Sequence, residues 1–205
     1  MILLSLLTAS ATEVELLAEA GMLANRDPAY EIFGYNRSMP SVGLATAIRP
    51  SADRHVPVAL VASWHHSTQG AQVYAPTARG FAAGFSTDSF ALGPRLDVDI
   101  GEVFSPYITA QGMVVRGLAR FDDEPNRNDN PGQTRYGGVA PGLLSLGGVE
   151  FSTPDIPGFS AEFVWRIELG YGLVGRIDLG DAGSMKPGGF VARTGMGVRF
   201  GRSGR

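Results

Sequence analysis

The residues best suited to catalysis by their types and spacing are His65 and Ser67, which stand two positions apart. Residues i and i+2 share one face of a β-strand, so the His65 imidazole can accept the Ser67 hydroxyl proton and make Ser67 a nucleophile. Asp88, on the expected neighbouring strand, is a candidate acid to orient His65. His-x-Ser also arises by chance. The alternative interpretation is therefore that His65 and Ser67 are polar residues at the rim of the fold with no catalytic role.

Metal and cofactor chemistry finds little support in the composition. The chain has no cysteine and three histidines, which removes thiolate metal sites, thiol nucleophiles and Fe–S clusters. His65 and His66 are adjacent in an expected strand, so they point to opposite faces and make a poor ligand pair. The sequence therefore predicts no metal and no cofactor.

The composition favours a single β domain. Gly and Pro supply 28 and 13 of 205 residues, a content that disfavours long helices and favours turns and short strands. The formal net charge of −3 gives no basic stripe for phosphate contacts, so we expect no nucleic-acid partner.

Alternating polar and apolar residues indicate eight strands. One face of each segment is apolar or aromatic, and the other holds charged residues and glycine. The expected strands are residues 12–24, 41–49, 56–65, 92–100, 107–118, 143–151, 161–172 and 190–200.

The expected connections alternate in length, with long ones near residues 25–40, 68–86, 120–138 and 174–188. This layout predicts an all-β, eight-stranded, antiparallel up-and-down barrel with four long loops on one side. Strands of about ten residues with an apolar outer face suit a transmembrane barrel. A lipocalin-like soluble barrel is the alternative.

Over residues 12–200 the pattern resembles the small outer-membrane β-barrels of the OmpA/OmpX kind. The closest local likeness is the last strand, Gly195-Met-Gly-Val-Arg-Phe200, similar to the C-terminal strand that the barrel-assembly machinery reads; residues 201–205 form a tail beyond it. The resemblance implies a monomer in the bacterial outer membrane, in contact with its lipid, with an unknown extracellular ligand at the loops. The His-x-Ser element is similar to that of outer-membrane phospholipases and lipid A deacylases, whose substrates are acyl esters.

The first eleven residues are expected to be a signal peptide. They form a short apolar run that ends in Ala9-Ser-Ala11, the A-x-A form that signal peptidase cleaves. Cleavage there would leave Thr12 first, and the mature barrel would be residues 12–200. A buried apolar N-terminal strand is the alternative.

Charged residues on the polar faces are predicted to form a lumenal network. Eight strands leave an interior only wide enough for side chains, so these groups should pair across the lumen and plug it. A narrow small-solute channel is the alternative. The predicted members are Glu13, Glu15, Glu19, Arg95, Asp97, Asp99, Glu162, Arg166, Glu168, Arg193 and Arg199.

Aromatic residues on the apolar faces are predicted to lie at the membrane interfaces. They are Trp64, Trp165, Tyr171, Phe190 and Phe200.

The sequence as a whole predicts a small, porin-like barrel of the cell envelope with a structural or surface-interaction role. An acyl-ester hydrolase that uses His65 and Ser67, and a narrow channel, are the alternatives.

Overall fold

The structure is a computed structural model of the chain. It describes residues 13–33, 37–49, 58–73, 81–98, 100, 103–122, 133–153 and 161–201. The predicted signal peptide, Asp99 and all of the predicted tail except Gly201 lie outside the described residues.

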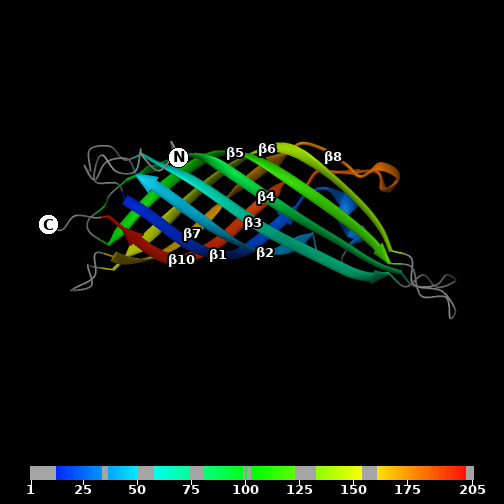
Figure 1. Cartoon of the computed structure of the whole chain (residues 1–205), viewed down its shortest axis with the longest axis horizontal. Helices are drawn as coiled ribbons and strands as arrows, with labels where there is room; N and C mark the ends of the chain where they lie inside the picture. Colours follow the sequence, from blue (N-terminus) through cyan, green and yellow to red (C-terminus); the bar gives the residue numbers. More distant parts are fainter. Residues whose placement is uncertain are drawn as a thin grey trace, which may run out of the picture.

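Eight long strands close into one antiparallel barrel (Figure 1), in the order β1-β10-β7-β6-β5-β4-β3-β2. The first and last strands pair with each other, with Val14 opposite Phe200. This confirms the predicted eight-stranded antiparallel barrel. The strands are β1 (Glu13–Asn25), β2 (Ser38–Arg49), β3 (Val58–Val73), β4 (Phe81–Asp97), β5 (Phe104–Asp122), β6 (Gln133–Ser152), β7 (Ala161–Val174) and β10 (Gly189–Phe200).

Several strands are longer than the sequence pattern suggested. The regions 68–86 and 120–138, predicted as long loops, are partly strand, because β3 pairs with β4 as far as Val73–Phe81 and β5 with β6 as far as Asp122–Gln133. Small residues in these stretches hide the alternation that marks a strand, whereas ladder hydrogen bonds between neighbours need no large side chain. The intervening residues 74–80 and 123–132 lie outside the described residues.

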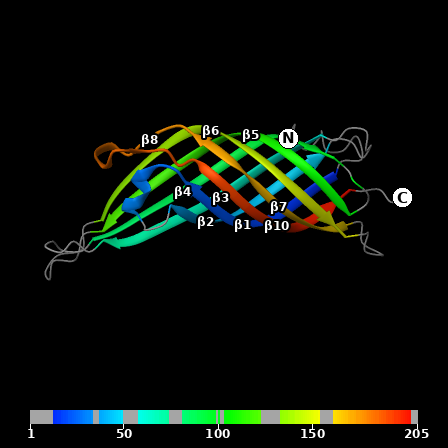
Figure 2. The same cartoon turned by 180° about the vertical axis from the view of Figure 1, so that it is seen from behind.

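The other two predicted loops contain short elements at the barrel end opposite the chain termini (Figures 1 and 2). They are the 3₁₀ turn η1 (Pro28–Ile32), and β8 (Ile177–Asp178), η2 (Gly180–Ala182) and β9 (Ser184–Met185). Asp27 caps η1 by accepting from the Ala29 N–H (3.0 Å) and also accepts from the Lys186 N–H (2.8 Å). One carboxylate thus ties the β1–β2 connection to the β7–β10 connection.

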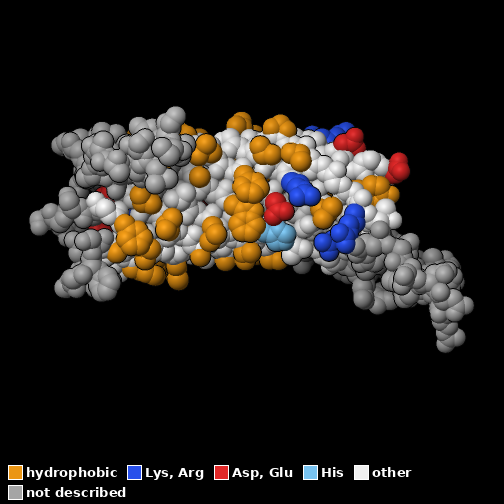
Figure 3. Space-filling view, viewed as in Figure 1, with side chains coloured by type: hydrophobic (Ala, Val, Ile, Leu, Met, Phe, Trp, Pro, Cys, Tyr) orange, Lys and Arg blue, Asp and Glu red, His pale blue; other side chains and the backbone are white. Residues whose placement is uncertain are grey.

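The outside of the barrel is apolar, and the buried charged side chains face the inside. Leu44, Phe90 and Leu169 are more than half exposed, while charged side chains on the opposite strand faces are buried. Figure 3 shows the apolar side chains along the barrel side. A water-soluble barrel has the reverse arrangement, so the outer surface suits a bilayer.

Among the described residues, no helix is both long and apolar enough to cross a membrane.

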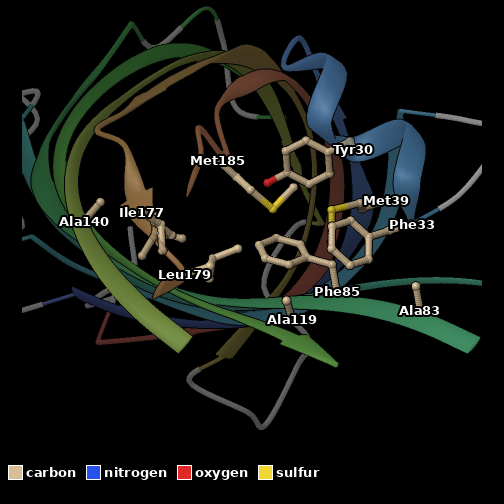
Figure 4. Packing of buried hydrophobic residues seen from close by; sticks show 11 residues of the cluster. Tyr30, Phe33, Met39, Ala83, Phe85, Ala119, Ala140, Ile177, Leu179 and Met185 are labelled. Carbon is tan, nitrogen blue, oxygen red and sulfur yellow. The ribbon is translucent and has the colours of Figure 1, made fainter. Parts of the chain in front are cut away.

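A cluster of apolar side chains lies inside the barrel at the end where η1 and the β8–β9 hairpin sit (Figure 4). Phe85 of β4 is 1% exposed and packs against Tyr30 and Phe33, with ring centroids 5.3 and 5.4 Å apart. The hairpin adds Ile177, Leu179 and Met185 to the same cluster. Segments that were predicted to be polar loops therefore fold inward and bury their apolar residues.

Tyr30 brings a polar group into this cluster. Its side chain is buried, and within the described part of the chain its hydroxyl has no hydrogen-bond partner. Burial, with Asp27 nearby, raises the pKa of the Tyr30 phenol, which therefore stays protonated at ordinary pH.

Replacing Phe85 should open a cavity in the apolar cluster. We expect Phe85→Ala to lower the free energy of unfolding by about 3–5 kcal/mol, because a buried aromatic leaves a cavity that its neighbours fill only in part. Urea unfolding in detergent micelles, followed by tryptophan fluorescence, measures the loss. Phe90→Ala is the matched control: Phe90 is on the same strand but 59% exposed on the outer face. Equal losses would contradict the packing described.

Removing the Tyr30 hydroxyl tests the same cluster differently. Tyr30→Phe keeps the ring and removes an unsatisfied buried polar group, so we expect the free energy of unfolding to stay constant or rise by up to about 1 kcal/mol. The same urea titration provides the measurement. A clear loss of stability would mean that the hydroxyl has a bonding partner.

Candidate functional site

Arg95 is the centre of a buried ion-pair network in the lumen. Its side chain is 1% exposed and donates to Asp97 Oδ1 (2.6 Å), Glu150 Oε2 (2.6 Å) and Glu15 Oε2 (3.1 Å). The guanidinium carbon also lies 4.1 Å from the centroid of the Tyr107 ring. One arginine from β4 thereby contacts side chains of β1, β5 and β6 across the barrel.

Arg199 makes a second bridge near the terminal end. From β10 it donates to Glu15 Oε1 (Nε, 3.0 Å; Nη2, 2.6 Å), to Glu162 Oε2 (3.1 Å) and to Glu150. Glu15 and Glu150 accept from both Arg95 and Arg199, so the two arginines share their carboxylates. This sharing joins the closing strands β1 and β10 to the opposite wall.

Arg49 extends the network to β2. It pairs with Glu13 and donates to Asp97 Oδ2 (2.9 Å).

Farther along the lumen, Arg166 of β7 is the centre of a second group of ion pairs, which Tyr107 links to Arg95. It donates to Glu19 Oε1 (Nε, 3.0 Å), and its Nε lies 3.7 Å from Glu168 Oε1. Glu168 also accepts from the Tyr107 hydroxyl at 2.8 Å. Arg193 lies on the same side of the lumen, but its Nε and Nη1 have no hydrogen-bond partner within the described part of the chain.

All predicted lumenal residues that the structure describes are buried on the inner face. Sequence reasoning missed three participants: Arg49, Tyr107 and Glu150. The position of Glu150 could have been predicted from the sequence. It lies an even number of residues after the inward-facing Leu144 and Leu146, and therefore on the same face of the strand. Arg49 and Tyr107 gave a weaker signal, because each stands at the edge of an expected strand, where facing is hardest to assign.

The His-x-Ser element faces the lumen. His65 and Ser67 are 4% and 5% exposed, while His66 between them faces outward. His65 Nε2 lies 2.8 Å from Glu19 Oε2. Gly43 makes this position possible, because a Cβ there would overlap the His65 ring on the neighbouring strand.

Asp88 does not reach His65. The β3–β4 register sets Asp88 opposite His66, and the His66 Nδ1 lies 3.0 Å from Asp88 Oδ1 on the outer face. The structure therefore corrects the choice of acid: Glu19, not Asp88, is the carboxylate beside His65, because adjacent residues of a strand point to opposite sides.

The space beside His65 and Ser67 is small. A cavity of about 30 Å³ is lined by these two residues, Thr87, Ser89 and apolar side chains that include Met113. This volume suits about one water molecule. By contrast, a trough of about 790 Å³, lined by side chains such as Leu44, Trp64 and Phe90, lies on the outer, membrane-facing surface.

The predicted interface aromatics lie on the outer face, and four of them lie toward one barrel end or the other, whereas Trp64 is near the middle of β3. Trp165 and Phe200 are in the half that contains the chain termini, and Tyr171 and Phe190 pair across β7 and β10 near the other end. The Trp165 ring stacks on Phe151 at 5.3 Å, and its Nε1 donates to Thr194 Oγ1 at 2.9 Å. Trp64 lies beside Phe90 in the β3–β4 register.

Among the described residues, no group of three or more His, Cys, Asp or Glu side chains is arranged to hold a metal ion.

Comparison with known proteins identifies the fold. No protein-family model matches the chain, and no curated protein matches its sequence. A crystal structure of Ail, the attachment invasion locus protein of Yersinia pestis, in complex with the heparin analogue sucrose octasulfate, superposes with a TM-score of 0.51 at 17% identity, covering 92% of this chain and 99% of that one. The fold is that of the small outer-membrane β-barrels. A major outer membrane protein from Thermus thermophilus gives a TM-score of 0.55 at 12% identity, covering 92% and 98% of the two chains.

Removing Arg95 should be far more costly than removing an exposed arginine. We expect Arg95→Ala to lower the free energy of unfolding by about 3–5 kcal/mol, because it leaves Glu15, Asp97 and Glu150 with less compensation. Urea unfolding in micelles measures the change. Arg37→Ala is the control: Arg37 pairs with Glu31 at 2.5 Å on the surface, where a loss below about 1 kcal/mol is expected. Similar losses in both variants would argue against a lumenal network.

Proposed function

We propose that the protein is a non-conducting outer-membrane barrel with a structural or surface-interaction role. The observation that carries this proposal is the arrangement of Arg95, Arg166 and Arg199 among lumenal carboxylates. Each arginine comes from one strand and pairs with acids of others, so the side chains plug the interior. The apolar cluster around Phe85 adds a second barrier at the loop end.

The proposed location follows from the outer surface and the fold. The outer face is apolar, with aromatic residues toward both ends, as expected for strands in contact with lipid. The proposed maturation removes residues 1–11, and the barrel-assembly machinery reads the last strand, which ends at Phe200. The protein acts as a monomer in this proposal, and pairing around the closed barrel leaves none of its eight strands as an edge for a partner strand.

The surface-interaction role is proposed for the barrel end opposite the termini. In a barrel with a plugged lumen, the connections between strands are the part that can contact other molecules. Loops on a rigid scaffold commonly contain the binding residues. Ail, which has a similar fold, was crystallised in complex with a heparin analogue. The extracellular ligand of the present protein is unidentified.

The acyl-ester hydrolase is a second candidate, favoured by one observation. His65 lies beside the Glu19 carboxylate, and Ser67 lines the same small cavity as His65 on the inner wall; a nucleophile, a base and an acid would be needed together for ester hydrolysis. The surroundings oppose it: both His65 and Ser67 face away from lipid, and a cavity of about 30 Å³ cannot admit an acyl ester. A narrow small-solute channel is opposed by the same buried groups.

The proposal predicts that the protein conducts no ions across a bilayer and hydrolyses no lipid. The folded protein, verified by a heat-dependent shift in its electrophoretic mobility in SDS, is inserted in a planar bilayer for single-channel recording. The same preparation is incubated with phospholipid and lipid A, and released fatty acid is measured. We expect neither current steps nor acyl release, because paired side chains fill the lumen and enclose Ser67.

Three results would overturn this proposal. Discrete current steps would support the channel, and Arg95→Ala should then change their amplitude. Acyl release that Ser67→Ala abolishes would support the hydrolase, with Ser89→Ala as the control, since Ser89 lines the same cavity. A protein found only in the soluble fraction, with one mobility in SDS, would point to a lipocalin-like barrel.

A further inference from the structure

Basic side chains on the outside of the barrel gather at one end. Five arginines face the lumen; every other Arg or Lys within the described ranges is exposed and lies toward the end that carries η1 and the β8–β9 hairpin. Figure 3 shows some of them beyond the apolar surface. The exposed set is Arg26, Arg37, Arg116, Arg120, Arg135, Arg176 and Lys186.

Three of these residues share one hollow, which we name the rim pocket. The rim pocket has a volume of about 390 Å³ and lies between the end of β1 and the β7–β10 connection. Arg26, Arg176 and Lys186 contribute its positive charge, and Asp27 is an acid in its lining. The two Asp27 carboxylate oxygens already accept from the Ala29 and Lys186 N–H groups, so the pocket keeps an excess of cationic donors.

The other wall of the rim pocket is aromatic and apolar. Tyr171 and Leu173 of β7 line it, and the Arg26 guanidinium carbon lies 5.3 Å from the Tyr171 ring centroid. Leu173 is 62% exposed, and Phe190, the register partner of Tyr171, is 48% exposed. These side chains continue the membrane-facing surface of β7 and β10 up to the basic residues.

This combination points to an amphiphile with an anionic head. Guanidinium and ammonium groups bind phosphate through charge-assisted hydrogen bonds. An aromatic and aliphatic wall next to them suits acyl chains that already lie against the barrel. A soluble sulfated sugar satisfies the charges but leaves Leu173 and Phe190 uncovered.

We propose that the rim pocket binds the phosphate-bearing head group of a membrane lipid, with its acyl chains along Tyr171, Leu173 and Phe190. The inference rests on the proposed membrane location, but not on the absence of conductance or hydrolysis. Arg176 and Lys186 hold the phosphate, and Arg26, stacked on Tyr171, closes the pocket on the β1 side. The volume is within the usual range for small-molecule sites.

The test compares two double variants that remove the same charge. Folded protein in micelles of an uncharged detergent is titrated with diphosphorylated lipid A, and bound lipid is counted by native mass spectrometry. We expect Arg176→Ala/Lys186→Ala to weaken binding about tenfold or more, because two charge-assisted contacts are lost. Arg37→Ala/Arg116→Ala, at the same barrel end but outside the rim pocket, should change affinity less than about threefold.

Each other outcome would overturn the proposal. If both double variants lost the same lipid affinity, the lipid would be attracted to the positive charge of the barrel end in general and not to the rim pocket. Lipid A without phosphate binding as well as the phosphorylated form would exclude the head-group contact. Heparin or inorganic phosphate binding with the same dependence on Arg176 and Lys186, and no preference for lipid, would make this a site for soluble anions.

Folding controls separate the site from the scaffold. Each variant is first tested for its heat-dependent mobility in SDS. Lys186→Ala removes only the side chain, so the Lys186 N–H bond to Asp27 remains. If the double variant fails to fold, Arg176→Gln alone replaces it, and an unchanged affinity then contradicts the proposal. A variant that loses lipid binding but stays folded and silent in a bilayer leaves the proposed function intact.

Discussion

The narrowness of a closed eight-stranded barrel governs the rest of this structure. Side chains must fill such an interior, and charges placed there must find partners without bulk water. Arg95 meets this requirement with three carboxylates and the Tyr107 ring, and Arg199 shares two of those carboxylates. Because the shared acids sit on β1 and β6, the ionic contacts also hold opposite walls at a fixed separation.

The lumen divides its chemistry along the barrel axis. Ion pairs occupy the part nearer the chain termini, whereas aromatic and aliphatic side chains around Phe85 occupy the opposite end. Buried ion pairs gain little net free energy after desolvation, but they penalise any arrangement that separates them. Apolar packing supplies stabilisation in proportion to the area buried. The two regions therefore contribute differently, the first mainly to register and the second mainly to stability.

The sequence was sufficient where strand faces differ strongly. Alternation of Phe163, Trp165 and Ile167 with Glu162, Arg166 and Glu168 placed β7 correctly, and the same logic located most of the lumenal charges. It failed where side chains are small, as in residues 68–86, or where a connection folds inward, as with Ile177 and Met185. It also paired Asp88 with the wrong histidine. A one-residue change of register exchanges inside for outside, and only the three-dimensional pairing shows that Glu19 lies beside His65.

The bond between Asp27 and the Lys186 N–H has a consequence for the order of folding. It joins residues 159 positions apart, and both flank the seam where β1 meets β10. Hairpins of neighbouring strands form from local contacts, but this hydrogen bond requires the first strand, β1, and the last strand, β10, to have come together. The contact between the β1–β2 and β7–β10 connections therefore depends on the pairing of β1 with β10 that closes the barrel. Protection of the Lys186 N–H from hydrogen exchange reports that the cylinder has closed, independently of whether individual hairpins have formed.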